Sequence, residues 1–230
     1  MCQEPVRYRM RHMKERMAFV VTACLLAATA GSAPGGAARI AFGQNLVVNG
    51  NAEAGPGSPN DGAKLMPIPG WKRMGTFTVI QYGGSGGFPD KNSPGPSNRG
   101  KNFFAGGPGS PKDQTSASQL IDVSTLSAGL KSGKAKFSFS AYIGGFASQA
   151  DYGYVTAAFL DSNGKRVGSA KLGPVTTKDR KSVTGLYSRS TSGRVPALTR
   201  KVIVEMVSVR KEGSFHDGYF DNIELNFVKG

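Results

Sequence analysis

From Asn45 to the end of the chain, apolar residues tend to recur at every second position, and this period constrains the fold more than any other feature. In 134–143 the apolar positions are Ala135, Phe137, Phe139, Ala141 and Ile143. Period two is the pattern of a strand with one buried face. No segment of a dozen residues keeps the 3.6-residue period of an amphipathic helix. The sequence therefore predicts an all-β protein.

Other stretches with the same period predict further strands: 77–82, 119–123, 154–160, 200–209 and 219–227. The turn sequence at 161–164 (DSNG) would join 154–160 to 166–172 as a hairpin. About eight to ten short strands with nothing helical between them favour an antiparallel sandwich or barrel.

Glycine and proline are concentrated in one part of the chain. The 32 glycines and 13 prolines have no Gly-X-Y period, which excludes collagen, and they gather in 54–111. A linker between two domains would have this composition, but Trp71, the strand at 77–82 and Phe103-Phe104 interrupt the segment. We expect long surface loops at the rim of a sandwich, where binding residues are common.

Residues 1–38 have the three-part layout of a signal peptide followed by a small-residue junction. A basic stretch at 7–16 precedes an apolar run at 17–30 and then small residues. The apolar run is shorter than the roughly 20 residues of a membrane-spanning helix. The first 12 residues could belong to an over-extended start. Cleavage is expected after one of three small residues: Ala30, Ala33 or Ala38.

The signal-like segment predicts a secreted, extracellular protein whose folded part is one domain, 39–230. The alternative is a lipid anchor at Cys24 in the cell envelope, because 21–24 (VTAC) resembles a lipobox. Cleavage at the alanines would remove Cys2 and Cys24, which excludes disulfides in the mature chain.

The protein is basic, but its basic residues are dispersed. The whole chain has 29 Lys and Arg against 15 Asp and Glu, and removal of 1–38 would leave a net charge of +11. The expected partner is a glycan or another envelope polymer rather than nucleic acid, and we expect a monomer.

Motifs at the two ends of 39–230 resemble those of one family. The first is 45–53 (NLVVNGNAE), followed about twenty residues later by 69–71 (PGW), and the second is 217–225 (DGYFDNIEL). Together they resemble the galactose-binding-domain-like β-sandwich, in particular carbohydrate-binding modules of the cellulose- and xylan-binding type. The resemblance spans about 45–228 and implies a jelly-roll sandwich that recognises a glycan without catalysis.

The resemblance also implies a structural Ca²⁺ ion. In that family the terminal strands lie close together and a calcium ion often lies near them. Glu53 and Asp221 would supply carboxylate oxygens, and backbone carbonyls around Asn49 to Asn51 would complete the shell. Calcium accepts such oxygen ligands. The alternative is that both acidic residues contact lysines or backbone amides at the surface.

Sugar-binding sandwiches use aromatic rings as platforms for the apolar faces of pyranose rings. Tyr142 is the best candidate, because it is out of phase with Phe137 and Phe139 and so should face away from the core. Trp71 is expected to be buried instead. The predicted ligand-binding residues are Tyr142, Gln149, Asp151, Tyr152 and Tyr82.

No catalytic residue is predicted. His216 stands beside Asp217, but no Ser lies in a GxSxG motif and the mature chain would have no Cys, so triad chemistry lacks a nucleophile. A glycosidase would need two carboxylates, and nothing in the spacing of Asp151, Glu205 and Asp217 indicates that they converge. Two alternatives remain: a cell-surface structural or interaction protein that binds protein or an anionic polymer, and a small glycan-acting enzyme.

Overall fold

The computed structural model describes residues 40–61, 64–109 and 113–230, so the predicted signal segment 1–38 lies outside the described residues. The described part forms ten β-strands, a 3₁₀ turn (η1) and one short helix (α1). Their bounds are β1 Lys72–Met74, β2 Thr78–Gln81, β3 Asn102–Pro108, β4 Gln114–Asp122, η1 Ser124–Leu126, α1 Ser127–Leu130, β5 Lys136–Gly145, β6 Tyr152–Leu160, β7 Arg166–Leu172, β8 Gly185–Arg194, β9 Lys201–Val209 and β10 Phe215–Val228.

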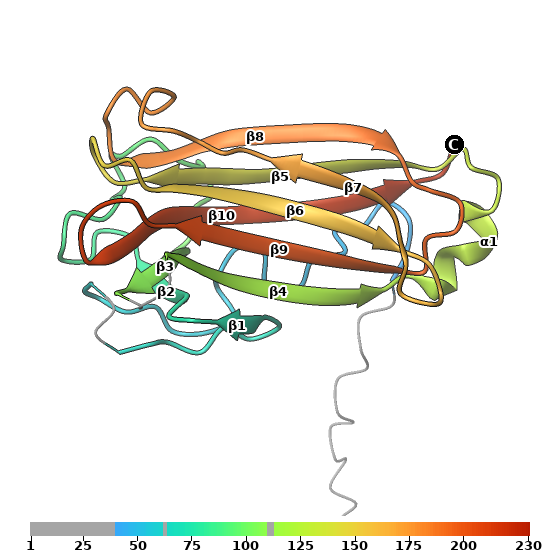
Figure 1. Cartoon of the computed structure of the whole chain (residues 1–230), viewed down its shortest axis with the longest axis horizontal. Coiled ribbons are helices and arrows are strands. Elements are labelled where there is room, and N and C mark those ends of the chain that lie inside the picture. Colours follow the sequence, from blue (N-terminus) through green and yellow to red (C-terminus); the bar gives the residue numbers. More distant parts are fainter. Residues whose placement is uncertain (1–39, 62–63, 110–112) are drawn as a thin grey trace, which may run out of the picture. The chain divides into compact units, whose positions relative to one another are not determined.

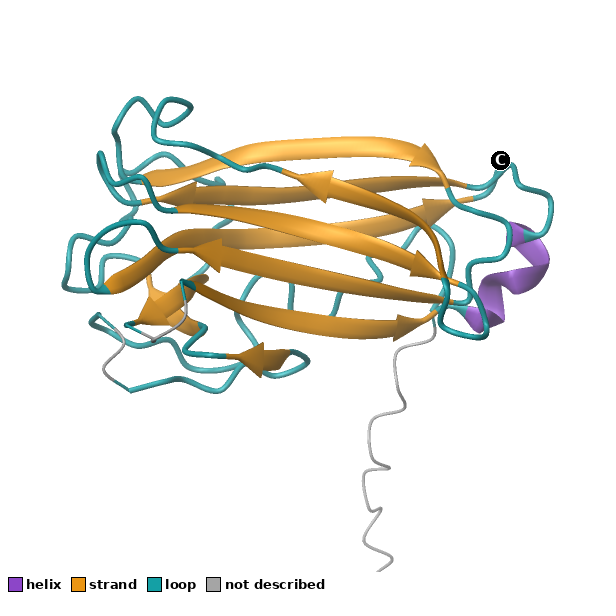
Figure 2. Cartoon of the chain, in the orientation of Figure 1, coloured by secondary structure: helices purple, strands orange, loops and turns teal. Residues whose placement is uncertain are grey.

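The strands form two five-stranded antiparallel sheets that face each other (Figure 1). Sheet A has the order β2-β3-β10-β5-β8, and sheet B has the order β1-β4-β9-β6-β7. The predicted antiparallel β-sandwich is therefore confirmed. The expectation of nothing helical between the strands needs one correction, since η1 and α1 follow β4 (Figure 2). In the described part no helix has the length and apolarity needed to cross a membrane.

The main core lies between the sheets. Alternation puts Phe137, Phe139 and Ile143 of β5 into this core, as their period predicts. Trp71 is also buried, and its indole Nε1 donates a hydrogen bond of 3.1 Å to the backbone oxygen of Asn49. The predicted structural role of Trp71 is confirmed.

A second, smaller hydrophobic cluster lies on the outer face of sheet A. It contains Phe103 and Tyr219 of the sheet together with Phe88, which comes from the Gly- and Pro-rich loop 82–101. The loop also reaches the edge strand β8, where the Leu186 amide donates a hydrogen bond of 2.9 Å to the backbone oxygen of Pro94. The predicted strand at 77–82 is β2, but the expectation of rim loops for the rest of 54–111 is wrong in part, because the segment also supplies β1, β3 and a cover over one sheet face.

The first motif lies beside the last strand, although it is not itself a strand. Backbone hydrogen bonds join Leu46 to Leu225 and Gly50 to Ile223. Between these points the chain makes turns with positive φ at Asn49 (51°) and elsewhere. A side chain on Gly50 would meet the backbone oxygen of Ile223 at 2.1 Å, so this close approach requires glycine.

The predicted hairpin between 154–160 and 166–172 is confirmed. β6 and β7 pair antiparallel. The Asp161 amide donates to the backbone oxygen of Lys165 at 2.9 Å, and Gly164 adopts a positive φ of 82°.

Candidate functional site

Two carboxylates from opposite ends of the chain lie near Tyr82. Asp221 of β10 is buried, and its Oδ2 accepts a hydrogen bond of 2.7 Å from the Tyr82 hydroxyl. Glu53 lines the same hollow as Tyr82. One oxygen of Glu53 accepts hydrogen bonds from the backbone amides of Lys101 (2.9 Å) and Asn102 (2.8 Å).

The electrostatics of this group favour a proton or a cation on Asp221. Burial is the main cause that raises the pKa of Asp221 to about 8; the charge of Glu53 acts in the same direction, and the hydrogen bond from Tyr82 opposes it. Burial also raises the pKa of Tyr82 above its ordinary value, and Asp221 adds to this. The guanidinium of Arg99 lies 5.3 Å from the centre of the Tyr82 ring. A buried carboxyl of this kind is stabilised when a positive charge approaches it.

The predicted ligands Asn49 and Asn51 hold the turn that carries Glu53. The side chain of Asn49 bonds to backbone groups of Pro69 and Ala54, at 2.9 and 3.0 Å. Asn51 accepts a hydrogen bond of 3.4 Å from the Glu53 amide. Within 40–61, 64–109 and 113–230 no three His, Cys, Asp or Glu side chains gather as a metal site would require. A calcium ion beside Glu53 and Asp221 would therefore need backbone, hydroxyl or water oxygens as its other ligands, which calcium accepts.

Tyr142 of β5 lies next to Asp221 of β10 in sheet A. It pairs with Asp221 of β10 on one side and with Ser188 of β8 on the other, and it is half-buried. A hollow of about 150 Å³ is lined by Tyr142, Ser140, Ser188 and Glu224, with Asn98 and Asn222 at one side. We call this hollow the Tyr142 groove.

The polar character of the Tyr142 groove continues along the outer face of sheet A. The next cross-strand row contains Glu224, Ser140 and Ser190. The row after it contains Asn226, Ser138 and Ser192. One side of the groove is built by loop 82–101, because Asn222 donates a hydrogen bond of 2.8 Å to the side-chain oxygen of Asn98. The result is a strip of hydroxyl, amide and carboxylate groups that begins at a tyrosine.

A larger hollow, of about 880 Å³, lies beside Glu53 and Tyr82. Its other lining side chains carry both signs of charge and include Asp90, Lys91 and Arg99. Tyr82 is the aromatic residue that lines it, and Arg99 lies over that ring. This hollow is therefore better suited to ions and polar groups than to the apolar face of a sugar.

The remaining predicted ligand residues, Gln149, Asp151 and Tyr152, do not line the Tyr142 groove. Asp151 is fully buried, and its carboxylate accepts hydrogen bonds from the backbone amides of Lys211, Glu212 and Asp217. The backbone oxygen of Gln149 accepts hydrogen bonds from Thr177 and Arg180. Tyr152 lies on β6 of sheet B and alternates with the inward Gly153, whose added side chain would meet the core ring of Phe220.

The carboxylates weighed for an enzyme do not converge either. Asp151 uses both oxygens to fix backbone amides, whereas Glu205 lies in the middle of β9, between Ser118 and Thr156. His216 is buried, with its Nδ1 3.3 Å from the backbone oxygen of Gly107. Asp217 lines a hollow at the end of the sandwich.

Several groove residues were missed from the sequence although a signal for some exists. The phase argument that singles out Tyr142 also points Ser140 outward, and the same argument applies to Glu224 of β10. Ser188 was missed because β8 has no clear apolar period. Nothing in loop 82–101 indicates that Asn98 lies over sheet A.

No protein-family model matches this sequence, and no curated protein is significantly similar to it. Solved structures that match part of this chain include the enzymatically active domain of tailspike protein 4 from bacteriophage CBA120, with a TM-score of 0.47 and 15% identity; the match covers 80% of this chain and 21% of that chain. A family 61 carbohydrate-binding module in complex with β-1,4-galactotriose has a TM-score of 0.42 and 13% identity, with 81% of this chain and 99% of that chain covered. A family 16 carbohydrate-binding module has a TM-score of 0.46 and 20% identity, with 79% and 99% covered.

The chain thus spans about a fifth of the tailspike domain and nearly all of the two modules. Two of these three structures are carbohydrate-binding modules. Similarity at these TM-scores and identities assigns neither a family nor a ligand to this chain.

Proposed function

We propose that this protein is a secreted, non-catalytic glycan-binding module whose binding surface is the Tyr142 groove and the polar strip that continues from it. The observation that carries the proposal is that Tyr142 of β5, Ser188 of β8 and Glu224 of β10 line one hollow across three neighbouring strands of sheet A. It combines one aromatic side chain with hydrogen-bonding groups on a rigid sheet. Pockets that recognise small ligands combine apolar surface with a few well-placed polar groups in this way.

The strip suits a chain-like sugar better than a compact ligand. Its rows follow β5, so that each further pair of residues along the strand offers another set of Ser, Asn or Glu side chains. Strand residues on one face repeat about every 6.6 Å, and several neighbouring sugar units could each meet polar groups. Secretion remains part of the proposal through the signal-like residues 1–38.

Calcium is the proposed cofactor. Glu53 and Asp221 would hold the ion, which would lower the pKa of Asp221 and link the N-terminal segment to β10. The burial of Asp221 and the charge of Glu53 both disfavour the ionised form of Asp221 in the absence of a cation, and this supports the proposal. In this proposal Asn49 and Asn51 shape the turn and are not calcium ligands through their side chains.

The test is glycan binding by the purified chain and by a matched pair of variants. A glycan array would identify a ligand, and calorimetry would measure its affinity. Tyr142→Ala should weaken binding about tenfold or more, whereas Tyr154→Ala, a half-buried tyrosine on sheet B, should change it less than about twofold.

Equal losses in both variants would refute the Tyr142 groove as the binding surface. Failure to bind any glycan would refute the carbohydrate proposal. Binding to a sulfated polymer that disappears at high salt would then favour the alternative of an interaction protein for anionic polymers.

A further inference from the structure

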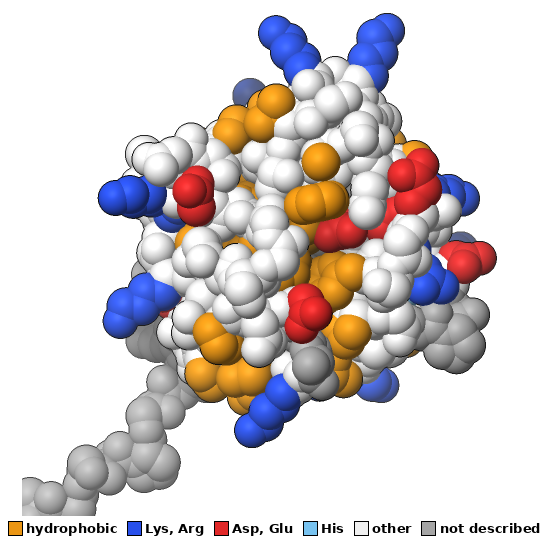
Figure 3. All heavy atoms as spheres, turned by 90° about the vertical axis from the view of Figure 1, so that its left-hand side faces the viewer, with side chains coloured by type: hydrophobic (Ala, Val, Ile, Leu, Met, Phe, Trp, Pro, Cys, Tyr) orange, Lys and Arg blue, Asp and Glu red, His pale blue; other side chains and the backbone are white. Residues whose placement is uncertain are grey.

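A separate hollow of about 240 Å³ lies at the loop end of the sandwich, away from the Tyr142 groove. It is lined by Phe88 of loop 82–101, Phe146 at the end of β5, and Phe215, Ser214 and Asp217 at the start of β10, with Asp61 at its edge. We call it the Phe pocket. Figure 3 shows this end of the molecule, where hydrophobic and acidic side chains lie next to each other.

The aromatic rings of the Phe pocket have fixed positions. Phe88 is 8% exposed, and its ring centre lies 5.3 Å from that of Phe215 and 6.0 Å from that of Tyr219. Phe146 packs against the backbone of Gly87, where an added side chain would meet the ring at 2.7 Å. Rings held in this way present apolar surface without losing conformational entropy on binding.

Asp217 adds a hydrogen-bonding group to this apolar surface. Its side chain is 6% exposed, and one oxygen accepts a hydrogen bond of 2.5 Å from the Tyr219 hydroxyl. Burial raises the pKa of Asp217 to about 7, against the effect of that hydrogen bond. The carboxyl group of Asp217 also has oxygen lone pairs that can accept a hydrogen bond from a ligand hydroxyl.

Buried groups behind the pocket hold its walls. Asp151 accepts hydrogen bonds from the amides of Lys211 and Glu212, and so fixes the loop that carries Ser214. The buried guanidinium of Arg180 donates to the backbone oxygens of Ala147 and Gln149, next to Phe146.

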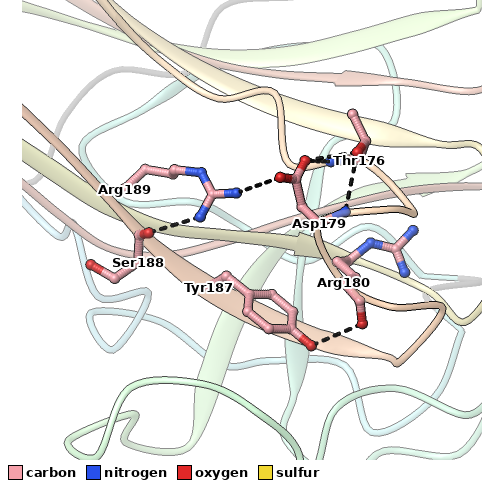
Figure 4. A network of polar contacts seen from close by, with 6 residues as sticks. All are labelled: Thr176, Asp179, Arg180, Tyr187, Ser188 and Arg189. Atoms are coloured by element: carbon pink, nitrogen blue, oxygen red, sulfur yellow. Dashed lines mark hydrogen bonds and ion pairs between the residues drawn. The ribbon is translucent and has the colours of Figure 1, made fainter.

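The loop between β7 and β8, which carries Arg180, is itself fixed by polar contacts (Figure 4). Tyr187 donates a hydrogen bond of 3.2 Å to the backbone oxygen of Arg180. Asp179 pairs with Arg189 at 3.3 Å and accepts hydrogen bonds from Thr176. The walls around Phe146 and Ser214 are thus set before any ligand arrives.

Size and charge define the ligand class. The volume is below the roughly 300–1,000 Å³ of pockets that enclose drug-sized molecules, so the pocket suits one ring. Of the described residues that line it, none is Lys or Arg, and Asp61 and Asp217 would repel an anion. We propose that the Phe pocket binds the terminal, uncharged pyranose of a glycan. This is a second binding site, and it does not depend on the Tyr142 groove.

The experiment uses two variants, each of which blocks one of the two sites with a large side chain, and measures the binding of two kinds of ligand to both. Ser214→Trp places a ring at the Phe pocket, and Ser188→Trp places one at the Tyr142 groove; both serines are exposed, so the core is untouched. Saturation-transfer NMR would measure binding of methyl β-galactoside, glucoside, mannoside and xyloside. Calorimetry would measure binding of the oligosaccharide found on the array. Ser214→Phe replaces the tryptophan variant if the latter does not fold.

We expect at least one methyl glycoside to bind the wild-type chain and the Ser188→Trp variant, and to lose binding about tenfold or more in Ser214→Trp. The Phe pocket proposal is overturned if no methyl glycoside binds the wild-type chain or if Ser214→Trp binds it normally. Oligosaccharide binding that is lost only in Ser188→Trp would, in that case, leave the proposed function intact. A chain that binds neither class of ligand would overturn both proposals.

Discussion

The outer faces of the two sheets differ although each sheet has five antiparallel strands. On sheet A, loop 82–101 buries a second hydrophobic cluster, and the carboxyl groups of Asp217 and Asp221 are almost completely buried. On sheet B, Leu120 is 62% exposed, and Lys171 lies 4.0 Å from the ring centre of Tyr154 at the surface.

This difference indicates that the sheet A side contains groups whose burial lowers the stability of the folded chain. A buried carboxyl is desolvated, which disfavours its charged form. Folding alone does not require such groups on a sheet face, because sheet B keeps its outer face without them. Buried groups with raised pKa values are candidates for binding sites. Asp217 and Asp221 are two such groups, and both belong to β10 of sheet A.

The largest expected difference between the faces concerns packing. Phe103 is fully buried, with ring centres of Tyr82 and Tyr219 at 5.0 and 5.2 Å. Phe103→Ala should lower the free energy of unfolding by about 3–5 kcal/mol, whereas Leu120→Ala should change it by less than about 0.5 kcal/mol. Denaturant unfolding measures both. Similar losses in the two variants would mean that the outer cluster of sheet A adds no more stability than an exposed side chain.

Calcium should stabilise the sheet A side. At a concentration one hundred times its dissociation constant, an ion that binds only the folded chain adds about 2.7 kcal/mol, and Tm should rise by roughly 5–10 °C for a chain of this size. Glu53→Gln and Asp221→Asn should abolish the rise. Asp122→Asn, at the end of β4 in sheet B, is the matched control and should keep it. A rise that survives in Asp221→Asn would exclude Asp221 as a ligand.

Stability without calcium should fall as pH increases toward neutral. Asp217 has a pKa of about 7 in the folded chain against 3.8 as the ordinary value, so between these values the folded state binds the extra proton. The free energy of unfolding is then highest below about pH 4 and decreases by up to about 1.4 kcal/mol per pH unit until about pH 7. The charged groups around Asp217 are Asp151 and Arg180, with Tyr219 as its hydrogen-bond donor. Asp221 contributes in the same direction.

The measurement is unfolding in a chelator between pH 5 and pH 7. Asp217→Asn keeps an oxygen that can accept the Tyr219 hydrogen bond, so it should fold and should reduce the slope by about 1 kcal/mol per pH unit. Leu120→Ala on sheet B should have the slope of the wild-type chain. An unchanged slope in Asp217→Asn would show that its proton uptake does not differ between the folded and unfolded states.

The sequence predicts the strands whose residues alternate and misses those whose residues do not. The period in 134–143 and 200–209 gave β5 and β9 to within two residues, since each has one face in the main core. β3 was missed because Phe103 and Phe104 are both buried, one in each cluster, so that its period disappears. β8 was missed because serines fill its outer face.

The candidate sites follow the same rule. The outward position of Tyr142 could be predicted because β5 fixes the phase. The Phe pocket could not, since Phe88 stands in a Gly- and Pro-rich loop without a period, and its meeting with Phe146 and Phe215 depends on where that loop crosses sheet A. Asp151 is a predicted ligand residue that the structure buries. The sequence does not reveal this burial, because the three backbone partners of Asp151 come from a distant part of the chain.

The smallest expected effect is the contribution to stability of the contact between Lys171 and Tyr154 on sheet B. Lys171 is exposed above the Tyr154 ring, so their attraction should contribute about 0.5–1 kcal/mol. A double-mutant cycle with Lys171→Ala and Tyr154→Leu would measure this coupling by denaturant unfolding, and Tyr154→Phe should preserve most of it because the ring remains. A coupling as large as the loss in Phe103→Ala would mean that sheet B also holds a preorganised surface. The weak coupling expected here would instead mean that this surface contact on sheet B contributes several times less to stability than the packing of Phe103 beneath loop 82–101 on sheet A.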